Sequence, residues 1–92
     1  MSNGIQTGTI PVVATATLVY KSRTPTGNTL TITTHQNSSD IYVGGPTVNT
    51  TDKNGIVLAK SLTTQIFVPY GEALYAAGTG LGDTLKWLTY DN

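Results

Sequence analysis

The side chains that could carry out catalysis or hold a metal ion are few in this sequence and lie far apart. His35 is the single histidine and cysteine is absent, so one chain lacks the ligands of an ordinary transition-metal site. Paired-carboxylate hydrolysis requires two acids at a defined separation. The acids here are scattered over different stretches: Asp40, Asp52, Glu72, Asp83 and Asp91. We expect His35 to lie at a strand end on the surface and most of the acids to solvate or cap turns.

Motifs for nucleophilic catalysis and phosphate binding are missing as well. No serine has the Gly-x-Ser-x-Gly context of a hydrolase nucleophile. Gly44-Gly45 and the glycine-rich stretch Gly78–Gly82 do not join a strand to a helix, as a phosphate-binding loop would. The sequence therefore predicts a protein that is not an enzyme and has no cofactor and no metal site.

The aromatic side chains are the remaining candidates for a binding role. Trp87 shares an alternating stretch with Leu85, which predicts a core position. The other aromatic rings could stack on sugars, or they could pack in a core or a protein interface. Both interpretations remain open, and a candidate interface is formed by four of these residues: Tyr42, Phe67, Tyr70 and Tyr75.

Short β-strands would have to position these side chains. Two turn signals, Asp52-Lys53-Asn54-Gly55 and Pro69-Tyr70-Gly71-Glu72, separate apolar runs. The runs alternate between apolar and polar residues, β-branched residues dominate, and helical spacing is not seen. We therefore predict an all-β fold, a small antiparallel β-sandwich or jelly-roll-like barrel of about seven to eight short strands.

The longest alternating run covers residues 10–21. Apolar residues occupy all of its even positions from 10 to 20, which predicts one long strand, bent or bulged midway, with these residues on one face: Ile10, Val12, Ala14, Ala16, Leu18 and Tyr20. Residues 1–9 are polar and rich in glycine, so we predict a flexible N-terminal arm there. Residues 10–92 are predicted to form a single β-sandwich domain.

The composition favours association over nucleic-acid or membrane binding. Five basic and five acidic side chains cancel, and only 11% of residues are charged, against about 25% in an average soluble protein. Such a surface offers no basic patch for nucleic acid, and no apolar run approaches the ~20 residues that span a bilayer. A net charge near zero favours self-association.

The stretch Ile41-Tyr42-Val43-Gly44-Gly45 resembles a run found in small structural proteins of tailed bacteriophages. The likeness continues through Asn54-Gly55, an alternating strand at Leu62–Val68 and a Leu-Tyr-Ala element at residues 74–76. It covers about half of the chain, from Thr29 to Gly78. The arm before Ile10 and the strand around Trp87 fall outside the match.

The resemblance implies a virion component, most directly a head decoration (cement) protein. Such a protein would be made in the host cytoplasm, form a homotrimer on the capsid surface, and stabilise the shell by bridging major capsid protein subunits. Two alternatives remain open at this point. One is a carbohydrate- or receptor-binding module of a tail or fibre, and the other is a neck or tail component that forms rings or tubes.

Overall fold

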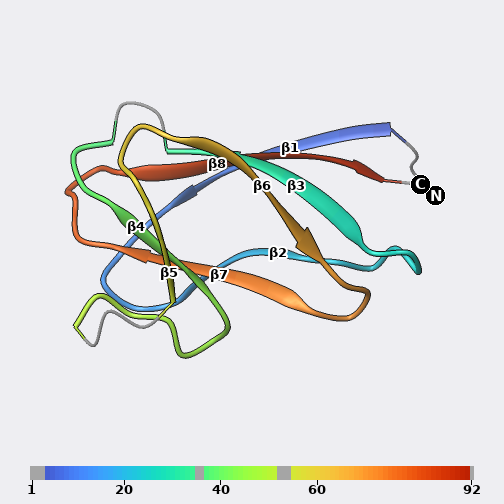
Figure 1. The fold of residues 1–92 in the computed structure, drawn as a ribbon, viewed down its shortest axis with the longest axis horizontal. Helices are drawn as coiled ribbons and strands as arrows, with labels where there is room; N and C mark the ends of the chain where they lie inside the picture. The colour runs from blue at the N-terminus through green and yellow to red at the C-terminus, as the bar shows by residue number, and fades with distance from the viewer. Residues whose placement is uncertain (1–3, 35–36, 52–54, 92) are drawn as a thin grey trace.

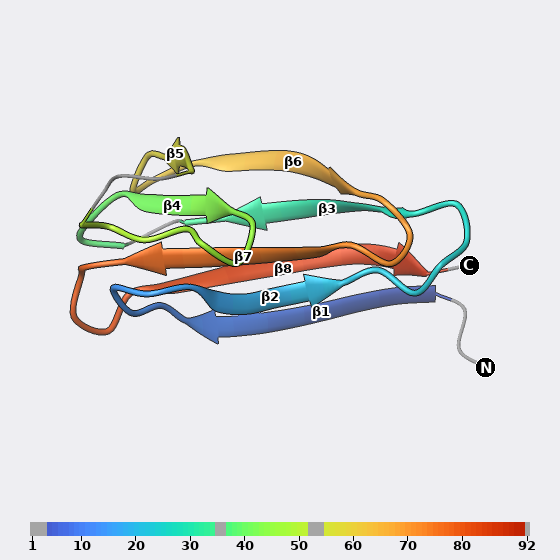
Figure 2. The same cartoon turned by 90° about the horizontal axis from the view of Figure 1, so that it is seen from below.

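The computed structural model describes residues 4–34, 37–51 and 55–91, which form eight β-strands and no helix. Sheet I has the strand order β1-β8-β3-β6 and sheet II the order β2-β7-β4-β5, and all pairs are antiparallel. Figure 1 shows the sheets as two stacked layers, and Figure 2 shows the order of the strands within them. The strands are β1 (Gly4–Pro11), β2 (Thr17–Lys21), β3 (Asn28–Thr33), β4 (Ile41–Gly44), β5 (Ile56–Leu58), β6 (Thr63–Val68), β7 (Ala73–Gly78) and β8 (Thr84–Asp91).

The chain changes sheet after every strand except at the β4–β5 connection. Two interleaved four-stranded sheets of this order constitute the double Greek key of an eight-stranded jelly roll. The prediction of an all-β, antiparallel sandwich or jelly-roll-like fold is therefore confirmed. The described residues contain no helix that is long and apolar enough to cross a membrane.

The hydrophobic core fills the space between the two sheets. Leu30, Ile32 and Leu85 of sheet I are completely or almost completely buried, and they face Ile41 and Val43 of sheet II. One residue separates Leu30 from Ile32 on β3 and Ile41 from Val43 on β4, as expected where one face of a pleated strand is buried. The remaining buried members of the core are Val12, Val19, Leu58, Val68, Leu74 and Ala76.

Trp87 packs against this core, in agreement with its predicted position. Its ring meets that of Tyr20 edge to face, with 4.9 Å between ring centroids and 60° between the planes. Gly8 lies directly opposite Trp87 in the β1–β8 ladder. A Cβ atom added at Gly8 would come within 2.5 Å of the indole ring, so the indole occupies the space that a side chain would take.

The predicted single strand over residues 10–21 is wrong. β1 ends at Pro11 and β2 begins at Thr17, and the two lie in different sheets. The register between β2 and β7 also shifts between Leu18 and Tyr20. This irregularity turns Val19 into the core and leaves Leu18 about half exposed. Apolar residues therefore recur at every second position while the chain crosses from one sheet to the other. Period-two spacing alone cannot reveal such a crossing.

The structure also corrects the predicted N-terminal arm for residues 4–9. These residues belong to β1, which pairs with β8 from Gly4–Asp91 to Pro11–Thr84. Threonines and glycines that looked like an arm are held by main-chain hydrogen bonds, which need no apolar side chains. Residues 1–3 lie outside the described residues.

A buried polar cluster closes one end of the sandwich. The Ser22 hydroxyl donates to Asn28 Oδ1 at 2.6 Å, and Asn28 Nδ2 donates to the Tyr90 carbonyl at 3.3 Å. The Thr89 hydroxyl in turn donates to the Thr29 carbonyl at 2.9 Å. Because buried polar groups are costly when left without partners, this network fixes how β2, β3 and β8 meet.

Replacing Gly8 with alanine should lower the free energy of unfolding by about 1–3 kcal/mol, because the new methyl group would displace the Trp87 ring from its packed position. Urea denaturation measures this loss. Gly45→Ala is the control, since a Cβ atom at Gly45 meets nothing within 4 Å. Equal stability of the Gly8 and Gly45 variants would contradict the packing described above.

Candidate interaction surfaces

Two of the acidic residues, Asp83 and Asp40, hold loops together through their carboxylates. The Asp83 carboxylate accepts hydrogen bonds from the Ser38 and Ser39 backbone N–H groups, at 2.8 Å and 3.0 Å, and from the Ser38 hydroxyl at 3.0 Å. Asp40 Oδ1 accepts from the Lys60 backbone N–H at 3.0 Å. Within the described part of the chain, no three potential metal ligands gather.

Two predicted positions cannot be placed. His35 and Asp52 lie outside the described residues, and so does most of the Asp52–Gly55 turn signal. Glu72 lies exposed in the β6–β7 turn, where its backbone N–H donates to the Pro69 carbonyl at 3.0 Å.

The four residues of the candidate interface do not form one cluster. Tyr42 and Tyr75 share the outer face of sheet II, because Tyr42 pairs with Ala77 and Tyr75 with Gly44 on neighbouring strands. Phe67 is 57% exposed on the opposite sheet, and Tyr70 is 62% exposed in the β6–β7 turn. The structure thus divides the aromatic residues among three surfaces.

The outer face of sheet I carries threonines in ordered cross-strand rows. In one row Leu88 lies between Thr7 and Thr31, and Thr31 pairs with Gln65. In the next row Lys86 lies between Thr9 and Thr33, and Thr33 pairs with Thr63. At the far end of the face Ile5 pairs with Tyr90, and Thr29 with Phe67. The face is therefore apolar at one end and hydroxyl-rich at the other.

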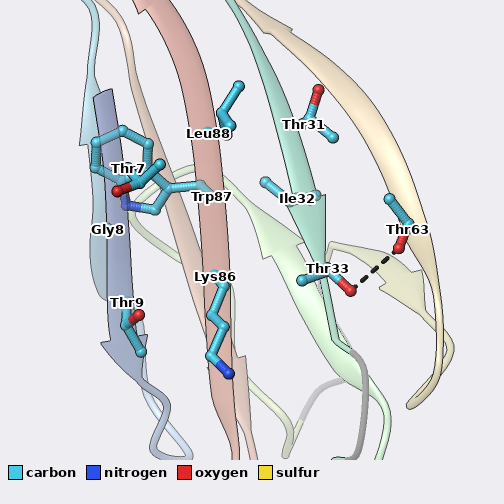
Figure 3. A pocket seen from close by; sticks show the side chains of 10 residues that line it. All are labelled: Thr7, Gly8, Thr9, Thr31, Ile32, Thr33, Thr63, Lys86, Trp87 and Leu88. Carbon is cyan, nitrogen blue, oxygen red and sulfur yellow. Dashed lines mark hydrogen bonds between the residues drawn. The ribbon is translucent and has the colours of Figure 1, made fainter. Parts of the chain in front are cut away.

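A hollow of about 660 Å³ opens on the hydroxyl-rich part of this face. Figure 3 shows Thr7 and Thr9 on its β1 side, Thr33 and Thr63 on its β6 side, and Lys86 between them. The Thr63 hydroxyl donates to Thr33 Oγ1 at 3.1 Å. The side chains that line the hollow from above the sheet are Thr7, Thr9, Thr31, Thr33, Thr63, Lys86 and Leu88.

The β6 edge of sheet I directs main-chain N–H and C=O groups away from the sheet at alternate residues. Thr34 donates its N–H to the Leu62 carbonyl at 2.8 Å, and Leu62 donates back to the Thr34 hydroxyl. The N–H and C=O of one strand residue point to the same side, and the side reverses at the next residue. The main-chain groups of the even-numbered residues of β6 therefore point towards β3. Those of three odd-numbered residues point towards the open edge: Thr63, Gln65 and Phe67.

The β1 edge follows the same rule. Val12 donates its N–H to the Asp83 carbonyl at 3.2 Å, one step beyond the Pro11–Thr84 pair. Even-numbered residues of β1 therefore face β8, and the N–H and C=O groups of Ile5, Thr7 and Thr9 face outward. Neither edge of sheet I carries a charged side chain, because β1 reads GIQTGTIP and β6 reads TTQIFV.

The edges of sheet II, unlike those of sheet I, are protected against pairing with a further strand. β5 has only three residues, and β2 carries both a register shift and Lys21. Short strands, irregularities and edge lysines are the features by which proteins prevent unwanted strand pairing. The two sheets therefore differ, and only sheet I offers long, regular and uncharged edges. Sequence periodicity located these strands in part, but it could not tell which of them lie at an edge.

No protein-family model matches this chain, and no curated protein matches it in sequence. One similar solved structure is a chain from work on Bacillus, described in the words "Bacillus endospore appendages form a novel family of disulfide-linked pili". The two chains superpose with a TM-score of 0.54 at 13% sequence identity, over 99% of this chain and 91% of the other. This likeness supports the jelly-roll fold and shows nothing further about the protein.

The hydrogen bonds to Asp83 predict a pH dependence. Two backbone N–H groups and the Ser38 hydroxyl stabilise the carboxylate and lower the pKa of Asp83 below its ordinary value, although burial acts in the opposite direction. The folded pKa is thus below the unfolded one. The resulting stabilisation is complete above pH 4, roughly the unfolded pKa, and is lost as the pH falls through the lower folded pKa.

We therefore expect thermal stability to fall on acidification from pH 5 towards pH 2, and Asp83→Asn to show a smaller fall. Thermal unfolding followed by circular dichroism at several pH values measures both. Glu72→Gln provides a control at an exposed acid. Identical pH profiles for wild type and Asp83→Asn would contradict this assignment.

Proposed function

We propose that this protein is a structural subunit that assembles with copies of itself through the two open edges of sheet I. The observation that carries the proposal is the pair of regular, uncharged edges on β1 and β6, opposed to the protected edges of sheet II. An unpaired edge of this length is a template for strand addition, and proteins that avoid addition usually block it.

The strand directions fit a continuous sheet. Neighbouring strands in sheet I are all antiparallel, so β1 and β6 run in opposite directions. A second copy placed beside the first in the same orientation brings its β6 antiparallel to β1. Each seam would then add one antiparallel ladder, which is the same pairing that holds the sheet together inside a subunit.

The outward-facing groups also match in number and register. β1 offers Ile5, Thr7 and Thr9, and β6 offers Thr63, Gln65 and Phe67. Pairing Thr7 with Gln65 places Ile5 beside Phe67 and Thr9 beside Thr63, so each cross-strand row of the outer face continues into the next copy. Side chains opposite one another are then alike in polarity, which favours this register.

Pairing of β6 with β1 is a heterologous contact, and heterologous contacts close into rings or continue as filaments. A closed ring of three on a phage head agrees with the motif resemblance at Ile41–Gly45, and head decoration is the setting that we propose first. The solved neighbour is described as belonging to disulfide-linked pili. A filament is the second setting, but this 92-residue sequence has no cysteine, so its seams would rest on noncovalent contacts. Neither setting requires an active site.

Proline at position 65 tests the seam. Gln65 points its main-chain N–H at the open edge, so Gln65→Pro removes an edge donor without removing a main-chain β3–β6 hydrogen bond. We expect wild type to form trimers or larger species at about 100 µM, and Gln65→Pro to shift towards monomer by at least about tenfold in dissociation constant. Analytical ultracentrifugation measures the masses.

Gln65→Thr is the matched control, because it also loses the hydrogen bond from Gln65 Nε2 to Thr31 Oγ1 but keeps the backbone N–H. It should assemble like wild type. A wild-type protein that stays monomeric, or a proline variant that assembles as well as the threonine variant, would refute the proposal. Co-sedimentation with phage heads then separates the head setting from the filament setting.

A further inference from the structure

We propose that the hollow on the outer face of sheet I binds an oligosaccharide that carries carboxylate groups. This site uses side chains on the face of the sheet, whereas assembly uses main-chain groups at its edges, although Thr7, Thr9 and Thr63 line the hollow and also lie beside the seam. It also differs from the aromatic site predicted from the sequence, since none of the four candidate aromatics lines the hollow.

The hydroxyl groups supply the first argument. Threonine hydroxyls both donate and accept hydrogen bonds, as sugar hydroxyls do, and five of them, from β1, β3 and β6 of the one sheet, line the hollow. Cross-strand hydrogen bonds hold part of this array in place, including Gln65 Nε2 to Thr31 Oγ1 at 3.3 Å. β-branched side chains on a strand have few rotamers, so little conformational entropy is lost on binding.

The charge of the face supplies the second argument. Lys86 lines the hollow, and no acidic side chain of the described residues occupies the outward-facing positions of β1, β8, β3 and β6. The face is therefore locally cationic on a protein whose net charge is zero. A single ammonium group among hydroxyls complements a carboxylate on a sugar better than it complements a neutral sugar.

Size and polarity supply the third argument. The volume of about 660 Å³ is within the range of small-ligand sites. Leu88 provides an apolar surface for the C–H face of a pyranose ring, and the row around it is flanked by Thr7 and Thr31. An extended peptide would pair with backbone groups, which lie at the edges and not in this hollow. An acidic sugar chain therefore fits better than a peptide.

Fluorescence of Trp87 offers a direct readout, because Trp87 is the single tryptophan and contributes to the lining of the hollow. The probes are tetrasaccharides of hyaluronan, alginate and polygalacturonate, with neutral chitotetraose as comparator. We expect at least one acidic tetrasaccharide to bind more tightly than chitotetraose. We also expect the binding to weaken in high salt, because screening reduces the ionic contribution.

Variants assign the site. Lys86→Gln should weaken acidic binding about two- to fivefold, as expected for an exposed ion pair, and Lys86→Arg should retain it. Thr7→Val with Thr9→Val removes two hydroxyls at nearly constant shape and should weaken binding about two- to tenfold per hydroxyl. Thr29→Val is the matched control, since Thr29 shares the face but does not line the hollow.

The titrations are run on wild type, Gln65→Pro and Gln65→Thr. Both variants lose the hydrogen bond from Gln65 Nε2 to Thr31 Oγ1, so a difference between them reports on assembly, and failure of assembly and failure of sugar binding are seen separately. Circular dichroism confirms that each variant is folded. The proposal is overturned if no acidic tetrasaccharide binds, if chitotetraose binds equally well, or if Lys86→Gln binds like wild type.

Discussion

The reversal of main-chain hydrogen bonding at each successive residue is the constraint on which the surfaces of this protein depend. In every second residue of β1 and β6, the main-chain N–H and C=O groups point towards the neighbouring strand of sheet I. In the other residues they point away from the sheet, towards solvent. The side chains alternate as well, so Leu30 and Ile32 point into the core and the threonines that alternate with them point outward. One periodicity thus builds the core, the open edges and the hydroxyl-rich face together.

The core is small, as it must be in a 92-residue domain, and polar groups complete it at both ends. Asn28 and Ser22 close one end, and the Asp83 carboxylate joins its loop to Ser38 and Ser39 near the other. These contacts are made by single side chains in the connections between sheets or, for Asn28, at the first residue of a strand. Charge is used sparingly throughout the fold, and Lys86 is the one charged side chain at the described outward-facing positions of sheet I.

Sequence reasoning recovered the fold class and the burial of Trp87, because period-two alternation reports directly on strands that are half buried. It missed the boundary between β1 and β2, since alternation persisted while the chain crossed from one sheet to the other. It also selected aromatics as the interface, although strand order places Tyr42 and Phe67 on opposite sheets. Which strand is an edge, and which threonines share a row, depend on long-range pairing that spacing in one chain does not encode.

The pairing of Gly4 with Asp91 brings the first and last described strands side by side at one pole of the jelly roll. A short linker joining these positions would therefore impose little strain, and the chain could be reopened within the exposed Gly45–Thr47 segment to give a circular permutant. In an ordered array of copies, any cargo fused at that pole would be displayed from a single side at a fixed repeat.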